Sequence, residues 1–251
     1  MPTCVVFDCE SDGKPTPAGD RGEKDFRYVR CTCACTLVVN ADNVMRFESA
    51  EGLVKESTHI TFWQDNTTNK GKPPFSLLLD LFDSAEIIVG FNAIDFDFPL
   101  LWKHYGNNRL RYDAHRFKTH DIFTRVRAFT PVWPSLNSLL LENKLATKSG
   151  DGANAIKLWE AQRRDELEAY CQKDVLLTLQ LALLPRIKYL KQTIPAHVYH
   201  LLPALQACYA ATAMAARTRP PPMIPAAACK DETLVPSTAG MEDYVLIFPT
   251  S

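Results

Sequence analysis

The stretch Val5-Val6-Phe7-Asp8-Cys9-Glu10 joins an apolar run typical of a buried strand to two carboxylates separated by one residue. Alternation along a strand places Asp8 and Glu10 on the same face. Two like charges at the end of a buried strand repel each other and lose hydration, so they are costly unless a cation neutralises them. The alternative is that both acids lie in a solvated turn, since Ser11-Asp12-Gly13 follows directly. The stretch therefore predicts a strand whose end is a candidate metal site, and on these residues alone the solvated turn is the favoured interpretation.

Length and charge limit the classes of protein to consider. The chain has 251 residues, a hydrophobic fraction of 46% and a formal net charge of -1, which fits one large domain or a domain with an appendage. Because the whole molecule is not basic, binding of nucleic acid would depend on local patches of Lys and Arg. The N-terminal residues lack the basic flank and apolar length of a secretory signal, and no apolar run is long enough to span a membrane. We expect an intracellular protein that has no membrane partner.

The eight cysteines are scattered irregularly through apolar segments, which predicts reduced, buried thiols rather than disulfides. A spacing of two along a strand predicts that Cys31, Cys33 and Cys35 place their sulfurs on one side. Zinc sites usually need a second cysteine pair, and the sequence shows none at suitable spacing. Three small strand residues are the favoured interpretation.

The first third of the chain predicts antiparallel strands. Residues 14–28 are rich in Pro, Gly and charge, which favours an extended loop over a tight hairpin. The β-rich run 29–40 predicts a second strand, a turn signal follows, and residues 44–47 are expected to return as a third. Residues 59–63 form another short extended segment. Together these segments predict an antiparallel meander.

The next segments change to an alternation of helix and strand. Residues 75–84 have the apolar density of a buried helix, and residues 86–91 read as a buried strand, so a parallel strand is added to the meander. Pro99 suits the first turn of the helix that follows. Asp95 and Asp97 thus lie at a junction between strand and helix, where ligand sites commonly form.

Three further segments precede the last long helix. Residues 117–123 predict a strand that includes His120 and Asp121, for which a structural or hydrogen-bonding role is favoured. Residues 135–143 predict a helix capped by its first serine. Residues 144–154 predict a loop that contains glycine but lacks the GxxxxGK[ST] pattern of a nucleotide-binding loop.

The C-terminal third begins with a strongly helical segment, residues 161–184. Tyr170 and Asp174 stand four residues apart in it and therefore share a face, as a structural pair or as part of a site. Residues 196–217 predict another helix. Residues 218–251 are rich in Pro and Ala, which predicts a tail that docks on the body or binds a protein partner.

Three ordered patterns resemble a known family. D-x-E at residues 8–10, N-x-x-x-F-D at residues 92–97 and Y-x-x-x-D at residues 170–174 resemble the exonuclease motifs of DEDDy 3′-5′ exonucleases in the ribonuclease H-like superfamily. VGFNAIDFDFPLL is similar to the second motif of B-family DNA polymerase proofreading domains. SLNSLL, GDGANAIKLW and AYCQKDVLLT resemble stand-alone exonuclease domains of this superfamily. Tyr170 decides the subclass, because the DEDDh branch has a histidine where this chain has Ala169.

The resemblance covers about residues 3–184 and implies an α/β fold. Its centre would be the mixed sheet of ribonuclease H-like proteins, with an antiparallel meander plus parallel strands, flanked by helices. We expect residues 1–217 to form this domain and residues 218–251 to form the tail.

The resemblance also implies an activity, namely hydrolysis of the terminal phosphodiester at a 3′ end to release nucleoside 5′-monophosphates. Two Mg²⁺ ions, with Mn²⁺ as a substitute, would be held by four acids: Asp8, Glu10, Asp97 and Asp174. Tyr170 would orient the attacking water, since a phenol with a pKa near ~10 is a poor base at neutral pH. Asn92, Phe96 and Lys148 are the expected substrate-binding residues, and single-stranded DNA is favoured over RNA as the substrate.

Two alternatives remain open at this point. The first is a catalytically silent ribonuclease H-like module that binds nucleic acid or recruits partners through its tail. The second is an endonuclease that cuts internally. Release of mononucleotides would exclude the silent module. Cleavage of a circular substrate would identify an endonuclease instead of an exonuclease.

Overall fold

The computed structural model describes residues 3–18, 23–40, 54–55, 57–64, 74–148 and 152–195. The strand expected at 44–47, the helix expected at 196–217 and the tail at 218–251 lie outside these residues and stay predictions. In the described part of the chain, no helix combines the length and the apolar composition that crossing a bilayer requires.

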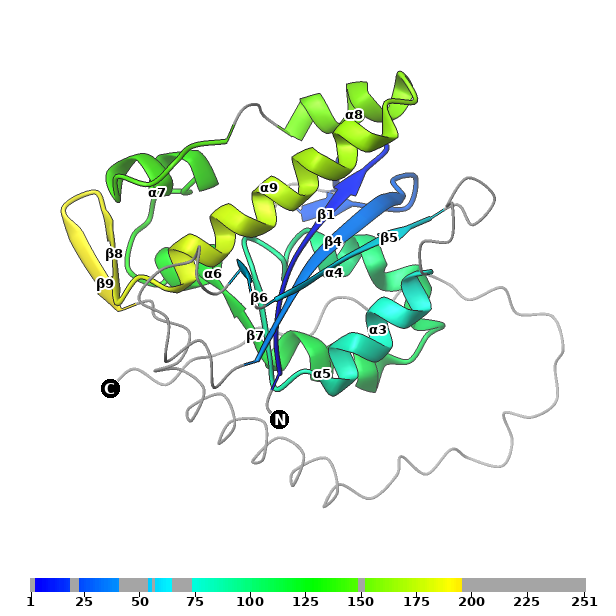
Figure 1. Ribbon diagram of the computed structural model, residues 1–251, viewed down its shortest axis with the longest axis horizontal. Helices are drawn as coiled ribbons and strands as arrows, with labels where there is room; N and C mark the ends of the chain where they lie inside the picture. The colour runs from blue at the N-terminus through cyan, green and yellow to red at the C-terminus, as the bar shows by residue number, and fades with distance from the viewer. Residues whose placement is uncertain are drawn as a thin grey trace, which may run out of the picture. The chain divides into compact units, whose positions relative to one another are not determined.

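A five-stranded mixed sheet forms the centre of the domain, in the order β5-β4-β1-β6-β7 (Figure 1). Its strands are β1 (Thr3–Ser11), β4 (Cys31–Asn40), β5 (Thr58–Trp63), β6 (Ile87–Gly90) and β7 (Thr119–Asp121). The pairs β1 with β4 and β4 with β5 are antiparallel, whereas β1 with β6 and β6 with β7 are parallel. The predicted fold class is confirmed: this is an α/β fold with a mixed sheet consistent with the ribonuclease H-like arrangement.

β1 is the central strand, and its apolar residues are buried on both faces of the sheet, as a strand between two helical layers requires. It pairs with β4 along its whole length, but it pairs with β6 only from Cys4 to Val6. The last residues of β1 therefore project beyond the end of β6. This projecting end contains Asp8 and Glu10.

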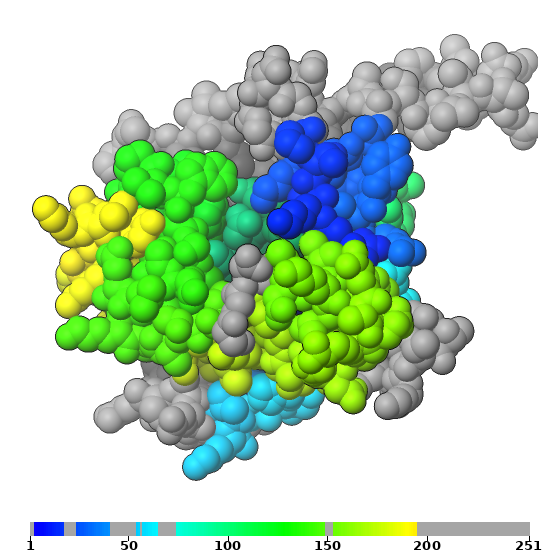
Figure 2. All heavy atoms as spheres, turned by 90° about the horizontal axis from the view of Figure 1, so that it is seen from above, coloured from blue at the N-terminus to red at the C-terminus, as the bar shows by residue number. Residues whose placement is uncertain are grey.

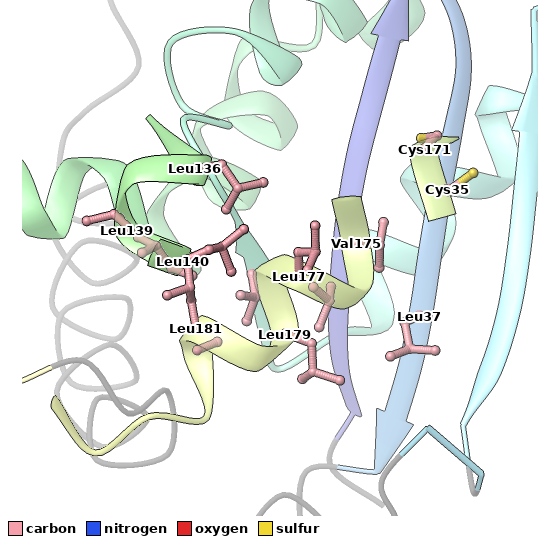
Figure 3. Close-up of a cluster of buried hydrophobic side chains, with 14 of the residues drawn as sticks. Cys35, Leu37, Leu136, Leu139, Leu140, Cys171, Val175, Leu177, Leu179 and Leu181 are labelled. Atoms are coloured by element: carbon pink, nitrogen blue, oxygen red, sulfur yellow. The ribbon is translucent and has the colours of Figure 1, made fainter. Parts of the chain in front are cut away.

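One face of the sheet is covered by α9 (Arg164–Ala182) together with α6 (Ile122–Arg127), α7 (Leu136–Glu142) and α8 (Gly152–Glu160). Figure 3 shows how the leucines of α9, such as Leu177 and Leu181, lie between the leucines of α7 and the sheet. Burial of several leucine side chains, at about 1.5–3 kcal/mol each, anchors α9 across the sheet. Because α9 crosses β1, the side chains of its middle turns reach the strand end.

The opposite face is covered by α3 (Phe75–Ser84), α4 (Asp97–Leu101), the 3₁₀ helix η1 (Trp102–Tyr105) and α5 (Arg109–Phe117). Phe7 of β1 packs edge-on against Phe82 of α3, with 4.8 Å between ring centroids, and against Phe98 of α4, at 5.5 Å. These contacts hold α3 and α4 against β1 at Phe7, the residue before Asp8. The expected helix over residues 75–84 is confirmed, and Pro99 lies in the first turns of α4 as predicted.

Other local predictions are confirmed as well. β5 matches the extended segment predicted at 59–63, so the antiparallel meander is present, with β5 beside β4. Ser135 caps α7, because its hydroxyl accepts a hydrogen bond from the amide of Ser138 and the Ser138 hydroxyl accepts one from the amide of Ser135.

Some element predictions were wrong. The loop predicted over 14–28 contains two short antiparallel strands, β2 (Thr16–Ala18) and β3 (Glu23–Asp25). The strand predicted over 117–123 is limited to the three residues of β7, because α5 ends at Phe117 and α6 begins at Ile122. α8 begins inside the segment predicted as a loop, at Gly152.

The cysteine prediction holds in part. The six cysteines in the described part of the chain are free and buried. However, Cys31 does not share a side with Cys33 and Cys35, because β4 has a bulge where Glu10 pairs with Cys33 but Ser11 pairs with Cys31. The extra residue reverses the alternation. Cys31 therefore packs with Cys9 in the core on the α3 side, whereas the other two pack under α9.

Candidate active site

Two carboxylates lie at the projecting end of β1. Ligand atoms of Asp8, Glu10 and Cys171 all lie within 4.8 Å of one another. Cys171 of α9 donates a hydrogen bond from its Sγ to the main-chain oxygen of Asp8, at 3.3 Å, which ties the helix to the strand. The alternation predicted from D-x-E thus brings both acids to one place. The thiol of Cys171 beside them was not expected, because the motif pattern points only to Tyr170 and Asp174.

The third acid, Asp97, is the first residue of α4, directly after the turn that follows β6. Asp97 Oδ1 accepts a hydrogen bond of 2.7 Å from the backbone amide of Cys9, the residue between the two β1 acids. This amide is available because β1 projects beyond β6. Asp97 is buried whereas Asp95 is exposed, so of the two aspartates in the motif only Asp97 joins the cluster.

The turn that presents Asp97 is tight. Asn92 adopts a left-handed conformation, with φ 61°, and a Cβ atom on Gly90 would lie only 2.6 Å from the Cβ of Ala93, so position 90 requires glycine. Asp121 at the end of β7 holds the turn, since its carboxylate accepts hydrogen bonds from the amides of Asn92 and Ile94, both at 2.9 Å. The hydrogen-bonding role expected for Asp121 is confirmed.

The fourth acid comes from α9. Asp174 and Tyr170 are buried on the face of α9 that meets the strand end. Asp174 Oδ2 forms an ion pair with Lys148 Nζ, and the same ammonium lies 5.3 Å from the centroid of the Tyr170 ring. Lys148, predicted as a substrate-binding residue, thus pairs with a carboxylate of the cluster. The backbone amide of Lys148 donates to Asn137 Oδ1 of α7, at 3.0 Å, which fixes the segment that positions it.

The cluster combines four carboxylates with one lysine, so repulsion between the carboxylates is only partly offset. Burial, together with the charges of Glu10, Asp97 and Asp174, raises the pKa of Asp8 well above its ordinary value. Burial and Asp174 do the same to the pKa of Glu10, and Lys148 offsets part of both shifts. Burial raises the pKa of Asp97 to about 7 despite the hydrogen bond from Cys9. The charges of Asp97 and Asp174 thus act on both carboxyl groups of β1.

A divalent cation fits this cluster. Asp174 Oδ1 is buried and has no hydrogen-bond partner among the described residues, which is unusual for a charged oxygen. A bound cation would satisfy it and would relieve the repulsion that raises the carboxyl pKa values. The cluster of Asp, Glu and Cys side chains could therefore hold a metal ion. Carboxylate oxygens dominate the donor set, which suits hard ions such as Mg²⁺ and Mn²⁺.

A cleft of about 250 Å³ opens beside the cluster. Ser11, residues 13–15, Phe96, Ala153 and Ile156 line it. Ser11 follows Glu10 and Phe96 precedes Asp97, so two of the lining residues are sequence neighbours of carboxylates in the cluster, although none of the four acids itself lines the cleft. Figure 2 shows that face, where the blue N-terminal segment lies beside the yellow-green α8 and α9. Phe96 was predicted as a substrate-binding residue, whereas sequence reasoning missed Ala153 and Ile156 because it placed the start of α8 in a loop.

Asn92 completes the set of predicted site residues. Its backbone belongs to the turn that presents Asp97, and its side-chain Oδ1 is buried without a hydrogen-bond partner in the described part of the chain. The structure thus brings together the carboxylates of residues 8, 10, 97 and 174, the ring of Tyr170 and the ammonium of Lys148. The cleft and the turn account for Phe96 and Asn92.

No family model matches the chain, and no curated protein sequence matches it. Among solved structures, the chain is similar to the family B DNA polymerase from the hyperthermophilic archaeon Pyrobaculum calidifontis, with a TM-score of 0.48 and 17% sequence identity. The match covers 72% of this chain and 24% of the polymerase, so the chain spans about a quarter of that protein. The likeness is distant, and the site residues are therefore interpreted from their own geometry.

Proposed function

We propose that this protein is a metal-dependent 3′-5′ exonuclease that releases nucleoside 5′-monophosphates from single-stranded nucleic acid. The observation that supports the proposal is the convergence of four carboxylates from β1, the turn after β6 and α9 beside an open cleft. The order of the three motifs along the chain, which resembles that of DEDDy exonucleases, points to the same activity.

Asp8, Glu10, Asp97 and Asp174 would hold two Mg²⁺ or Mn²⁺ ions. When bound, such ions supply a water of lowered pKa and positive charge that stabilises the oxygens of a phosphoryl transition state. The protein contributes a rigid arrangement: the Cys9 amide orients Asp97, and the Cys171 thiol fixes α9 against β1. Lys148 keeps one oxygen of Asp174 in place through its ion pair.

Tyr170 acts as a hydrogen-bonding group rather than as a base. Burial raises its pKa to about 12, so the phenol keeps its proton at neutral pH. A protonated hydroxyl beside the carboxylates is suited to orient the attacking water or a phosphate oxygen. This assignment agrees with the role that the resemblance implies.

The cleft is suited to receive the terminal nucleotide. Phe96 offers an aromatic ring beside the carboxylates, and Lys24 Nζ lies 5.5 Å from the centroid of that ring. Ile156 and Ala153 of α8 supply apolar surface in the same cleft. A base lying on this surface would bring its 3′-terminal phosphodiester toward the carboxylates.

The direct test compares variants on a 5′-labelled oligonucleotide. The full chain should shorten single-stranded DNA stepwise with Mg²⁺ or Mn²⁺, release 5′-mononucleotides, and stop in EDTA. Asp174→Asn should lose about 10²–10⁴-fold in rate, since metal-assisted charge stabilisation is worth several kcal/mol. Asp95→Asn is the matched control, because Asp95 is an exposed acid of the same motif. Equal rates for wild type and Asp174→Asn would refute the proposal.

Parallel reactions on duplex DNA and RNA establish the substrate class, and cleavage of circular single-stranded DNA would identify an endonuclease instead.

One observation favours a second candidate, a metal-free module that binds nucleic acid without hydrolysis. Lys148 is an internal cation that already neutralises part of the cluster, since it lowers the pKa values of Asp8, Glu10 and Asp174. Such a module would bind single strands in EDTA and release no mononucleotide with any divalent ion. The same oligonucleotide assay separates it from the exonuclease.

A further inference from the structure

We infer that the segment from Arg125 to Trp133 is a second contact site for nucleic acid, on which unpaired bases stack. This inference rests on the proposed exonuclease function and deepens it. It names the surface that would hold the part of the strand outside the cleft. The site spans the last turn of α6 and the segment that leads to α7, and it consists of two exposed aromatic rings, those of Phe129 and Trp133, each accompanied by an arginine of α6.

The first observation is a cluster of exposed apolar side chains. Trp133 is 66% exposed, Phe129 is 47% exposed and Val132 is 46% exposed, all within five residues. A single exposed apolar residue is ordinary, but a contiguous group that includes tryptophan marks an interaction site. Tryptophan has a large apolar surface, and burial of that surface by a partner would stabilise the complex.

The second observation is that each ring has a guanidinium group over it. The guanidinium carbon of Arg127 lies 4.8 Å from the centroid of the Trp133 ring, and that of Arg125 lies 5.2 Å from the centroid of Phe129. Arg127 is also held by the backbone, because its Nη1 donates to the carbonyl oxygens of Thr130 and Pro131. The Arg127 and Trp133 pair is therefore ordered before any partner binds, which lowers the entropy lost on binding.

The third observation connects this segment to the candidate active site. The ring of Trp133 packs on Phe123 of α6, at 5.3 Å, and Phe123 packs on Phe91, at 5.8 Å. Phe91 directly precedes Asn92 in the turn that presents Asp97. At its other end, the segment leads into α7, whose Asn137 holds the backbone of Lys148. The ring of Trp133 is thus joined to the turn before Asp97 through packed rings, and the segment is joined to Lys148 through the chain and one hydrogen bond.

Charge identifies the partner. No acidic residue occurs between Asp121 and Glu142, whereas two arginines do, in a chain whose net charge is -1. A single-stranded nucleic acid offers phosphates for guanidinium groups and flat bases for aromatic rings, which is the combination that such sites use. An acidic peptide would use the arginines but leave the rings exposed. In a duplex the bases are already stacked, so the site is specific for unpaired strands.

The test measures binding without turnover. Fluorescence anisotropy of a labelled oligo(dT) of about twelve nucleotides is recorded with the full chain in EDTA at low salt. Trp133→Ala should weaken binding by about 5- to 100-fold, the range expected for loss of one stacked base. Leu110→Ala is the control for loss of an exposed apolar side chain, since Leu110 on α5 is 78% exposed. Trp102→Phe, on the opposite face of the sheet, is the control for a change of tryptophan.

A second measurement separates this inference from the proposed function. Hydrolysis of thymidine 5′-p-nitrophenyl phosphate, a substrate with one nucleoside and therefore no further base to stack on Trp133, should be equal for wild type and Trp133→Ala. KM for the long strand should rise in the variant. If nothing is hydrolysed but binding in EDTA still depends on Trp133, the exonuclease proposal fails and the stacking site stands.

Three results overturn the inference: no binding of oligo(dT) by the wild type, equal binding by wild type and Trp133→Ala, or a dependence on Trp133 for a polyglutamate peptide alone. The last result would assign the surface to an acidic protein segment. Arg127→Gln, which keeps the tryptophan, should weaken binding in the same direction as Trp133→Ala and so guards against a folding defect in one variant.

Discussion

Asp83 and Asp174 are both aspartates on helices with a cationic partner, yet their surroundings differ. Both oxygens of Asp83 are paired, Oδ1 with His115 Nε2 at 2.7 Å and Oδ2 with Arg111 at 2.6 Å. Asp174 has one oxygen paired with Lys148, and its other oxygen is buried without a partner among the described residues. The partners of Asp83 within the chain thus satisfy both of its oxygens, whereas a bound cation would satisfy the second oxygen of Asp174.

The pKa values of the two aspartates follow this difference. Burial acts to raise the pKa of Asp83, but hydrogen bonds from Arg111 and His115 lower it below its ordinary value. Burial raises the pKa of Asp174, and Lys148 offsets the shift only in part. A buried acid that the chain neutralises stabilises the fold, whereas one left partly uncompensated is typical of a functional site.

The largest expected contrast is in the pH dependence of stability without metal. Asp97 has a pKa of about 7 in the folded protein against 3.8 ordinarily, so the folded state binds more protons between these values. The contribution of Asp97 to the free energy of unfolding therefore falls as pH rises from about 4 to 7. The fall is at most ~4 kcal/mol, at ~1.4 kcal/mol per pKa unit. Burial lowers the pKa of His115 from 6.5 to about 4, so between these values the unfolded chain binds more protons than the folded chain. The contribution of His115 to the free energy of unfolding therefore rises with pH, opposite to that of Asp97.

Urea denaturation in EDTA between about pH 4 and 7 measures the free energy of unfolding, in which the two contributions add. Asp97→Asn should remove the falling component, so that the variant gains stability relative to wild type as pH rises. Asp95→Asn should leave the wild-type profile unchanged because Asp95 is exposed. Parallel profiles for wild type and Asp97→Asn would show that the carboxyl group is not perturbed in the folded protein.

The next contrast separates stability from activity. His115→Ala removes a buried side chain that bonds both Tyr105, at 2.9 Å, and Asp83. We expect the free energy of unfolding to fall by about 2–4 kcal/mol, with the rate of oligonucleotide hydrolysis per folded molecule unchanged. Denaturation and the nuclease assay on the same preparation check both. A selective loss of hydrolysis would place His115 in the site and abolish the distinction between the clusters.

The smallest expected effect is stabilisation by metal. Mg²⁺ or Mn²⁺ at about a hundred times its Kd should raise the free energy of unfolding by about 2.7 kcal/mol. Asp8→Asn should lose this gain because it removes a carboxylate from the cluster, whereas His115→Ala should keep it. Chemical denaturation with metal and with EDTA gives the values. The same gain in Asp8→Asn would locate the ion elsewhere on the protein.

Sequence reasoning succeeded where the signal was local. The strand ending in Asp8 and Glu10, the buried helix α3 and the serine cap of α7 each depend on residues a few positions apart. The addition of a parallel strand to the antiparallel meander followed from the change to alternating helices and strands, whereas the order of the strands came only from the structure. The choice of Asp97 over Asp95 came from motif spacing, and the structure supports it through burial.

It failed where conformation depends on distant parts of the chain. The hairpin of β8 (Arg186–Tyr189) and β9 (Gln192–Pro195) turns at Leu190 and Lys191, both at positive φ, where Asn-Gly is the usual signal. α5 is rich in charge and has few apolar residues, so its burial comes from Tyr112 and His115 alone. The ion pair of Lys148 with Asp174 and the bulge in β4 arise only when α9 and β1 have packed.

The unequal lengths of β1 and β6 have a consequence for how the site tolerates change. The donor that holds Asp97 is a main-chain N–H, so any residue except proline at position 9 preserves it. An insertion that extended β6 along β1 would occupy that N–H with a ladder hydrogen bond and displace the aspartate. The hydrogen bond to Asp97 thus depends on where the neighbouring strand stops, whereas the buried side chain of Cys9 is constrained separately by its packing in the core.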